Sequence, residues 1–304
     1  MTSRLVSVGN VIVDLTLRIP ALPERGSDVL ARDTGSTPGG AFNTLVAAVR
    51  QGLASAYGGA HGVGPHGDRV RSALSAEGIA VLLDPSPDAD TGFDIALVDD
   101  DGERTFVTVF GAEARLAARE LVSISLGAGD LVHVSGYGLL ESTNAGVLAP
   151  WIAGIGPGHT VLFDPGPLAT TVPAEALATV AGRADWLSCN LREALSLTGE
   201  SDAGAAATAL RESWRAVVIR LGPQGCLVVE DEARFVPGFA AEAIDTTGAG
   251  DAHTGAFLAA LASGEPPPAA ARRANACAAI AVTRRGPATA PTAPEVQRLL
   301  DGAD

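Results

Sequence analysis

The stretch DTTGAGD at residues 245–251 continues directly into AHTGAFLAAL at residues 252–261. Gly248 and Gly250 stand where an extended segment passes into an apolar, alanine-rich helix, which we expect from Asp251 onward. The first turn of a helix presents unpaired backbone N–H groups at the positive end of the helix dipole, which suits an anion. Asp251 would stand beside that anion, where its carboxylate could accept a proton from an attacking hydroxyl. The alternative is that Asp245 or Asp251 only caps the helix.

Around this stretch, the hydrophobic pattern predicts strands that alternate with helices. Expected strands are residues 5–14, 80–83, 131–134, 160–163, 186–188, 216–220 and 226–229, and expected helices begin near residues 40, 68, 251, 269 and 294. This alternation predicts a single α/β domain over residues 1–304, with a doubly wound, mostly parallel sheet covered by helices on both faces. Ligands of such sheets bind at the carboxyl ends of the strands, where Asp14, Asn190 and residues 248–251 are expected.

Two stretches depart from this pattern, at about residues 15–37 and 91–110. In the second, Phe93, Ile95 and Leu97 alternate with small or polar neighbours, and residues 99–102 predict a turn. The pattern indicates a hairpin with one covered face. Together the two stretches predict a small β lid that projects from the main domain.

Composition excludes several classes of protein. Apolar residues make up 47% of the 304 residues and charged residues 18%, as in a globular protein. The net charge of −14 argues against a nucleic-acid partner. The apolar run near the N-terminus is too short to span a membrane, and the three cysteines show no CxxC spacing, so we expect a cytoplasmic protein with buried thiols.

All 21 basic residues are arginines. The absence of lysine excludes a Walker-A lysine, a Schiff-base lysine and the phosphate-binding lysine of protein kinases. The segment GVGPHG at residues 62–67 fits the GxGxxG pattern of dinucleotide-binding proteins. However, it does not follow the first strand, and Pro65 lacks an N–H group that a pyrophosphate would need. A dinucleotide-dependent oxidoreductase is therefore the weaker alternative, and a structural or substrate-lining role for these glycines is favoured.

Two further groups of residues carry polar chemistry. Asp14, Gly39, Gly40 and Asn43 form a set suited to a polyol, because a carboxylate accepts from adjacent hydroxyls and glycines let hydroxyls approach the backbone. Asn190 and Glu193 lie three apart on an expected helical turn. They would either cap that turn or join a network around a nucleotide and Mg²⁺.

Taken together, these motifs resemble those of the ribokinase-like (PfkB) carbohydrate kinases along the whole chain. DTTGAGD at 245–251 is close to the C-terminal signature of that family, and Asn190 and Glu193 match its NxxE motif. RLGPQG at 220–225 and NACAAIAVTRRG at 275–286 match two further motifs in the family order.

The resemblance implies a role for each matching residue. Asp251 would be the general base, and Gly248, Ala249 and Gly250 would form the anion hole for the transferred phosphate. The ATP site would include Asn190, Arg220, Gly222, Gly225 and Asn275, with Glu193 in the Mg²⁺ network. K⁺ is a further expected cofactor, held by Asp245, Thr247 and the carbonyls of Val282 and Arg285. The sugar would lie against Asp14, Gly39, Gly40 and Asn43, and the lid would be shared with a second subunit in a homodimer.

The sequence also departs from ribokinases near the sugar. GGAFN at residues 39–43 has one residue fewer than their GGxxxN motif, and residues 131–136 lack the carboxylate that ribokinases carry there. The expected activity is therefore ATP-dependent phosphorylation of a hydroxyl on a small sugar or sugar-like molecule, without commitment to ribose. A nucleoside kinase of the same fold is the alternative, with Phe42 stacked on the base. A non-catalytic sugar sensor is disfavoured because Asp251 and its glycines are intact.

Overall fold

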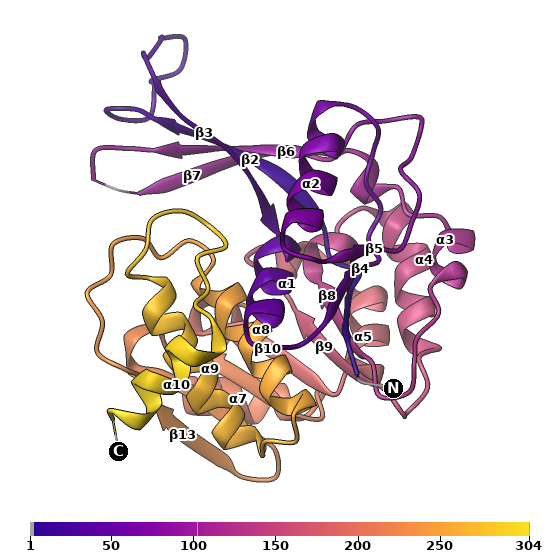
Figure 1. The fold of residues 1–304 in the computed structure, drawn as a ribbon, viewed down its shortest axis with the longest axis vertical. Helices are drawn as coiled ribbons and strands as arrows, with labels where there is room; N and C mark the ends of the chain where they lie inside the picture. The colour runs from indigo at the N-terminus through magenta and orange to yellow at the C-terminus, as the bar shows by residue number, and fades with distance from the viewer. Residues whose placement is uncertain (1–2, 102, 304) are drawn as a thin grey trace.

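The computed structural model describes residues 3–101 and 103–303, and its body is built on one large sheet (Figure 1). The strands of this sheet are β1 (Leu5–Ser7), β4 (Ser55–Tyr57), β5 (Ala80–Val81), β8 (Leu131–Ser135), β9 (Thr160–Asp164), β10 (Trp186–Asn190), β11 (Val217–Arg220), β12 (Gly225–Val229) and β13 (Ala233–Pro237). Their order is β13-β12-β11-β10-β9-β8-β1-β4-β5. Only the pairings of β12 with β11 and β13 are antiparallel. The predicted fold class is confirmed.

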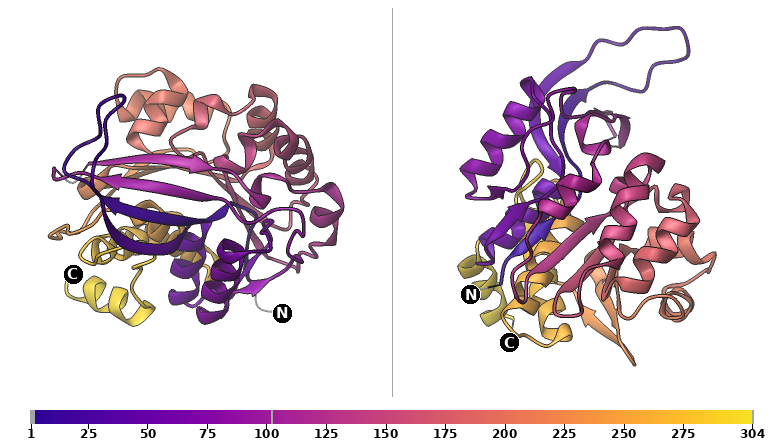
Figure 2. Two further views of the ribbon diagram at one scale, coloured as in Figure 1. Left: turned by 90° about the horizontal axis from the view of Figure 1, so that it is seen from above. Right: turned by 90° about the vertical axis from the view of Figure 1, so that its right-hand side faces the viewer.

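Helices cover both faces of the sheet and enclose two hydrophobic cores (Figure 2). One layer holds α1 (Ala41–Arg50), α2 (Pro65–Ala76), α8 (Ala249–Ala262), α9 (Pro267–Ala281) and α10 (Ala293–Asp301). The other holds α3 (Ala118–Ser123), α4 (Ser142–Ala153), α5 (Ala174–Arg183), α6 (Leu191–Thr198) and α7 (Ala203–Arg211). In β8, Leu131 belongs to the first core, whereas Val132 and Val134 belong to the second. Strands covered on both faces are apolar on both, which explains their nearly continuous hydrophobic runs.

A second sheet of four strands projects from the body as a lid (Figures 1 and 2). It contains β2 (Val11–Arg18), β3 (Arg32–Gly40), β6 (Phe93–Val98) and β7 (Arg104–Val109), in the order β3-β2-β6-β7. Because β2 follows the carboxyl end of β1 after three residues, the lid rises from the edge of the sheet where ligands of α/β proteins bind.

The prediction of one strand over residues 5–14 was wrong. The run divides at residues 8–10 into β1 in the body and β2 in the lid. A Cβ at Gly9 would lie only 2.9 Å from the Cβ of Ala41 and 3.1 Å from that of Ser135, so the chain bends there through a narrow gap. Asp14 therefore lies within a lid strand and not at the end of a core strand. The lid also includes Gly39 and Gly40, which extends it beyond the expected residues 15–37.

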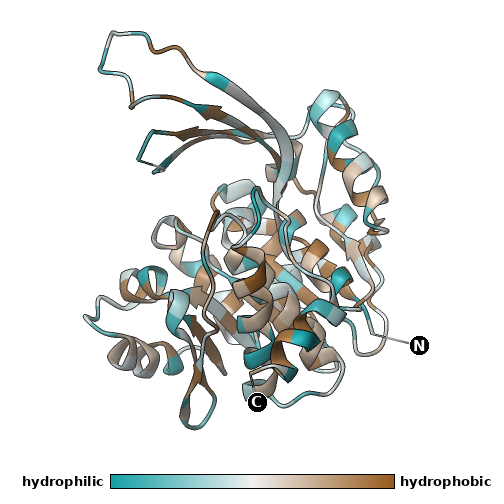
Figure 3. Ribbon diagram, turned by 60° about the vertical axis from the view of Figure 1, so that its left-hand side comes forward, coloured by the Kyte–Doolittle hydropathy of each residue, from teal (hydrophilic) through white to brown (hydrophobic). Residues whose placement is uncertain are grey.

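The predicted hairpin at residues 91–110 is present as β6 and β7, but its two strands differ in burial. Asp94 and Ala96 of β6 are buried, whereas Phe106, Val107 and Val109 of β7 are 51%, 52% and 45% exposed. Figure 3 shows the hydrophobic residues along these lid strands. The expected covered face is thus present on β6 and absent on β7 in the single chain.

Within residues 3–101 and 103–303, no helix combines the length and apolar character needed to cross a bilayer. Cys189, Cys226 and Cys277 are all buried, as expected, and none forms a disulfide.

Candidate active site

The first turn of α8 lies at the centre of the candidate site. The helix begins at Ala249, two residues before the expected start, because Gly248 adopts a left-handed conformation with φ of 72° and ends the preceding segment. That conformation favours glycine. No side chain caps the helix. The N–H of Ala249 donates to the carbonyl oxygen of Thr246 at 3.2 Å, and the first turn of α8 otherwise offers backbone N–H groups that an anion can bind.

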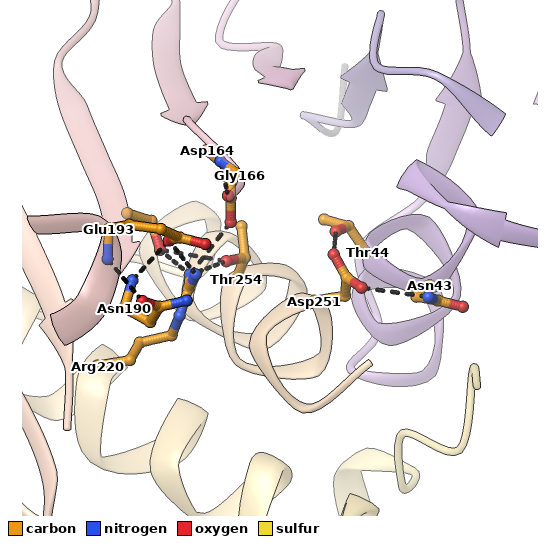
Figure 4. A network of polar contacts seen from close by, with 10 residues as sticks. Asn43, Thr44, Asp164, Gly166, Asn190, Glu193, Arg220, Asp251 and Thr254 are labelled. Atoms are coloured by element: carbon orange, nitrogen blue, oxygen red, sulfur yellow. Dashed lines mark hydrogen bonds and ion pairs between the residues drawn. The ribbon is translucent and has the colours of Figure 1, made fainter. Parts of the chain in front are cut away.

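Asp251 points from this turn toward α1 (Figure 4). Its Oδ2 accepts a hydrogen bond from Asn43 Nδ2 at 3.1 Å, and its Oδ1 accepts one from Thr44 Oγ1 at 3.1 Å. Burial, together with the charge of Asp164, raises the pKa of Asp251 to about 6. The carboxylate does not cap its own helix, and a pKa near neutrality suits a general base.

Acidic side chains from the lid lie near Asp251. Asp14 of β2 and Asp94 of β6 are directly paired in the register of these parallel strands. Burial, the charge of Asp94 and the charge of Asp251 raise the pKa of Asp14 to about 8, and burial raises that of Asp94 to about 6. A ligand that offers hydroxyl groups to these carboxylates would relieve the cost of their burial.

Several buried polar atoms of this region have no hydrogen-bond partner in the protein. They are Asn10 Nδ2, Asn43 Oδ1 and Asp94 Oδ1. Buried polar atoms normally have a partner, so the unpaired oxygens of Asn43, which bonds Asp251, and of Asp94, which pairs with Asp14, indicate a place for a polar ligand. The amide nitrogen of Asn43 thus donates to Asp251, while its amide oxygen has no partner and can accept a hydrogen bond from a ligand.

The glycines at the base of the lid are required by close packing. A Cβ at Gly39 would lie 2.2 Å from Oδ2 of Asp14, so no side chain fits between this backbone and the carboxylate. Gly40 has a φ of 62°, and a Cβ there would lie 2.4 Å from the carbonyl oxygen of Asn10. That oxygen accepts the N–H of Ala41 at 2.9 Å, which fixes the start of α1 against the lid.

On the other side of α8, Arg220 is the centre of a polar network (Figure 4). Its Nη1 lies 2.7 Å from Ser188 Oγ, 3.2 Å from Asp164 Oδ2 and 3.1 Å from Thr254 Oγ1. Its Nη2 lies 3.6 Å from Oε2 of Glu193. A Cβ at Gly250 would lie 3.4 Å from the guanidinium carbon, so the positive charge is adjacent to the first turn of α8.

Asn190 and Glu193 form a helix cap, which is one of the two roles that the sequence indicated for them. Each side chain accepts the backbone N–H of the other residue at 2.8 Å, which is a capping box at the start of α6. The cap is not a solvated turn, since Glu193 is buried and its pKa is raised by burial and by Asp164. The Glu193 carboxylate also faces Arg220, so this residue can cap α6 and still belong to a polar network around the phosphates of a nucleotide.

The remaining residues expected at the nucleotide lie along the same edge. Gly222 and Gly225 have φ values of 61° and 112°, and a Cβ at Gly225 would lie 2.1 Å from the carbonyl oxygen of Val236. Asn275 is buried in α9, and its Nδ2 donates to the carbonyls of Val236 and Pro237, each at 3.1 Å. The structure thus brings the loop at residues 220–225, β13 and α9 together.

The loop before α8 is held by Asp245. Its Oδ1 accepts from the backbone N–H and the hydroxyl of Thr247 at 2.9 and 2.7 Å, and its Oδ2 accepts from the N–H of Gly286 at 3.0 Å. Arg104 of the lid also donates to Oδ1, at 2.5 Å. The carbonyl of Val282 accepts from the N–H groups of Ile244 and Asp245 at 2.8 and 3.1 Å, and Arg285 is exposed.

Two sequence-based alternatives lose their support. At the GVGPHG segment, the Asp90 carboxylate accepts the N–H groups of His66 and Gly67 at 3.0 and 2.8 Å and thereby occupies the start of α2. The glycines permit close packing, since a Cβ at Gly67 would meet the carbonyl oxygen of Gly62 at 1.9 Å. Phe42, expected beside the sugar and offered as a base-stacking residue, is only 6% exposed and packs in the core.

The sequence analysis missed several residues of this region, among them Asn10, Thr44, Asp94, Arg104, Tyr137 and Asp164. Tyr137 follows the stretch where ribokinases carry a carboxylate, and burial together with Asp94, Glu193, Asp164 and Asp251 raises its pKa to about 12. Asp164 could have been found as the polar residue that ends an apolar strand. The others had no local signal, because their partners lie far away in the sequence.

The doubly wound sheet, the lid and the uncapped turn at Asp251 define a sugar kinase of ribokinase-like fold. A family model described as the pfkB family carbohydrate kinase matches residues 2–294. The chain belongs to this family, and it transfers a phosphoryl group from ATP to a hydroxyl of a sugar or sugar-like molecule.

Relatives agree with this assignment. The chain is 32% identical to the uncharacterized sugar kinase YegV of Escherichia coli (strain K12), over 95% of this chain and 91% of that protein. It is 31% identical to the ATP-dependent ribose-1-phosphate kinase of Halopiger xanaduensis, over 98% of each chain. The structure of the fructokinase of Vibrio cholerae O395, with fructose, ADP and calcium ion bound, is 28% identical with a TM-score of 0.81, and the match covers 98% of this chain and 99% of that one.

Proposed function

We propose that this kinase phosphorylates an uncharged sugar held between the lid and α1, with Asp251 as its general base. The observation that carries the proposal is the position of Asp251. On one side it bonds Asn43, whose amide oxygen is unpaired, and lies near Asp14 and its strand partner Asp94, and on the other side Arg220 lies next to the same first turn of α8. A proton acceptor at such a boundary can serve a hydroxyl from one side while a phosphate arrives from the other.

In the proposed reaction, the sugar hydroxyl donates its proton to a carboxylate oxygen of Asp251. The hydroxyl oxygen bonds to the γ-phosphorus of ATP, and the bond from that phosphorus to the bridging oxygen breaks, so that ADP carries the electron pair away. The N–H groups of Gly248, Ala249 and Gly250 at the start of α8 stabilise the charge on the transferred group, and Arg220 offsets the negative charges of Asp164 and Glu193 beside them. No lysine is needed, because the amides and the dipole of α8 provide the positive potential.

The acidic residues proposed to face the sugar determine which charge on the substrate fits the site. The pKa of Asp14 is raised by burial and by the charges of Asp94 and Asp251, and the pKa of Asp94 is raised by burial. At neutral pH Asp94 is ionised and would repel a phosphate or carboxylate on the substrate, whereas the protonated Asp14 and the ionised Asp94 can together donate to and accept from hydroxyl groups. We therefore propose a neutral polyol as substrate, unlike the substrate in the name of the Halopiger relative.

The proposed nucleotide site uses the Asn190 and Glu193 cap, Arg220, the glycines Gly222 and Gly225, and Asn275. Within residues 3–101 and 103–303, no group of three or more His, Cys, Asp and Glu side chains is arranged to hold a metal ion. Mg²⁺ would therefore be held mainly by the phosphates of ATP, with Glu193 and Asp164 reaching it through water. When bound, Mg²⁺ neutralises charge on the phosphates.

A homodimer through the lid is also part of the proposal. The exposed Phe106, Val107 and Val109 of β7 present apolar surface at the edge of the lid sheet, and a second subunit would cover it. Sedimentation of the protein, compared with that of a Val107→Lys variant, tests this. A monomer at all concentrations would contradict it.

The test of the proposed substrate is ADP release across a panel of neutral sugars, sugar phosphates, sugar acids and nucleosides, with ATP and Mg²⁺ present. We expect the highest kcat/KM with a neutral sugar. A preference of tenfold or more for a phosphorylated sugar, a sugar acid or a nucleoside would contradict the assignment of the pocket. As a control, the same panel with Asp251→Asn reveals ADP release that does not depend on the site.

A further inference from the structure

Arg104 joins the lid to the loop that forms the anion hole. It lies at the start of β7, and its Nη2 is 2.5 Å from Oδ1 of Asp245. The two side chains are 27% and 16% exposed, so water only partly screens the pair. Asp245 is separated from Gly248 by two residues, and its contacts with Thr247 therefore set the path of the chain into α8.

Two of the four residues that the family resemblance assigns to a monovalent cation, Asp245 and Val282, already have their ligand oxygens engaged by protein donors. The Asp245 carboxylate accepts hydrogen bonds from Thr247, Gly286 and Arg104, and these interactions lower its pKa to about 2. The carbonyl oxygen of Val282 accepts two backbone N–H groups. Asp245 and Val282 therefore do not fit a K⁺ ion while Arg104 contacts Asp245, because the ion would share a carboxylate oxygen with a guanidinium and meet its repulsion.

We propose that Arg104 replaces the monovalent cation in this kinase, so that closing the lid delivers the positive charge that orders residues 245–250. The inference rests on the proposed function, since those residues lead into the anion hole and the base. Arg104 is a positioning residue. It acts through its contact with Asp245. A guanidinium suits the task, because its charge does not depend on pH and its donors are fixed in a plane.

The consequence is a kinase that is indifferent to K⁺. In buffers of equal ionic strength that contain either KCl or tetramethylammonium chloride, we expect the kcat of the natural protein to differ by less than about 2-fold. Arg104→Ala should lose roughly tenfold in kcat in tetramethylammonium, with little change in the KM for ATP, and K⁺ should restore much of that loss. Arg104→Gln, which keeps hydrogen-bond donors without the charge, should behave like Arg104→Ala. Arg104→Lys should stay independent of K⁺.

Thermal unfolding provides a second measurement that needs no turnover. K⁺ should raise the Tm of Arg104→Ala and Arg104→Gln relative to tetramethylammonium, and should leave the Tm of the natural protein unchanged, since a ligand stabilises only the protein that binds it. Arg18→Ala is the matched control, because it removes another lid arginine with an exposed side chain on β2. That control should remain indifferent to K⁺ in both measurements.

The proposal is overturned if K⁺ activates the natural protein several-fold, or if the two uncharged variants keep full kcat without K⁺. It is also overturned if K⁺ shifts the Tm of the natural protein as much as that of the variants. Failure of the proposed function gives a different result. No sugar would then support ADP release in either buffer, while the Tm comparison would still report whether Arg104 and K⁺ compete for Asp245.

Discussion

The two sides of α8 differ in whether their acidic residues have a cation as partner. On the side proposed for the nucleotide, Asp164 and Glu193 face the guanidinium of Arg220, although burial and Asp164 raise the pKa of Glu193. In the loop before α8, four donors hold Asp245 and lower its pKa to about 2. On the sugar side, the pKa values of Asp14 and Asp94 are raised, and Asp94 keeps an unpaired oxygen. Paired acids hold the chain in place, whereas unpaired acids are available for proton transfer and for hydroxyl groups of a ligand.

Asp251 belongs to both sides, so its removal should have the largest effect. Asp251→Asn keeps the size of the side chain and removes its basicity, and we expect kcat to fall roughly 10²–10⁴-fold. Binding of ATP, measured by calorimetry, should change little because the amide groups of α8 remain. Turnover near that of the natural protein would exclude the residue from proton transfer.

Arg220 tests the paired side. Arg220→Met removes the charge beside Gly250 and leaves Asp164 and Glu193 without their cation. We expect kcat to fall by about 10²-fold and the free energy of unfolding to fall by roughly 3–5 kcal/mol. Arg220→Lys serves as the control and should retain most of the stability. If the methionine variant is as stable as the natural protein, Arg220 does not stabilise the fold as the counter-ion of Asp164 and Glu193.

Asp94 tests the unpaired side. Asp94→Ala should raise the KM for the sugar about 10–100-fold, because a charge-assisted hydrogen bond to a hydroxyl is lost, while kcat changes less. The KM for ATP should stay the same in steady-state assays. The sugar KM of Asp94→Asn should lie between that of the natural protein and that of Asp94→Ala. An unchanged sugar KM in the alanine variant would remove Asp94 from the binding site.

The smallest expected effect is on stability, and it depends on pH. An acid whose pKa is raised from 3.8 to about 8 by folding destabilises the folded protein progressively as pH rises between these values. Asp14→Asn removes this penalty, so its Tm should exceed that of the natural protein by at least about 2 °C at pH 9, and the difference should vanish near pH 4. Melting curves across this range measure it. A difference that is constant with pH would show that Asp14 does not titrate as described.

Much of this site could be predicted from local sequence. The turn at residues 248–251, the Asn190 and Glu193 cap and the glycines at residues 39 and 40 all have local signals, because backbone conformation and capping depend on neighbouring residues. The parallel sheet followed from apolar runs covered on both faces. The sequence did not reveal β4, which has only three residues, or β13, which is an exposed edge strand, because such strands show little hydrophobic pattern.

The rest depended on contacts between distant segments. Asp94 meets Asp14 only because β6 pairs with β2, and Arg104 meets Asp245 across 141 positions of sequence. The division of residues 5–14 into two strands was also missed, although Gly9 and Asn10 interrupt the apolar run at the point where it occurs. Its cause is the crowding of Gly9 by Ala41 and Ser135, which no local pattern reveals.

That division has a mechanical consequence. Asp14 stands on a lid strand that leaves the body at Gly9, so any rotation of the lid about that point carries the carboxylate with it. A lid that opened about Gly9 would separate Asp14 from Asp251, so one movement would both assemble the proposed acceptor pocket and shield it from solvent. Such a kinase would phosphorylate water poorly while its lid was open, because half of the proposed acceptor site would then lie away from the proposed base.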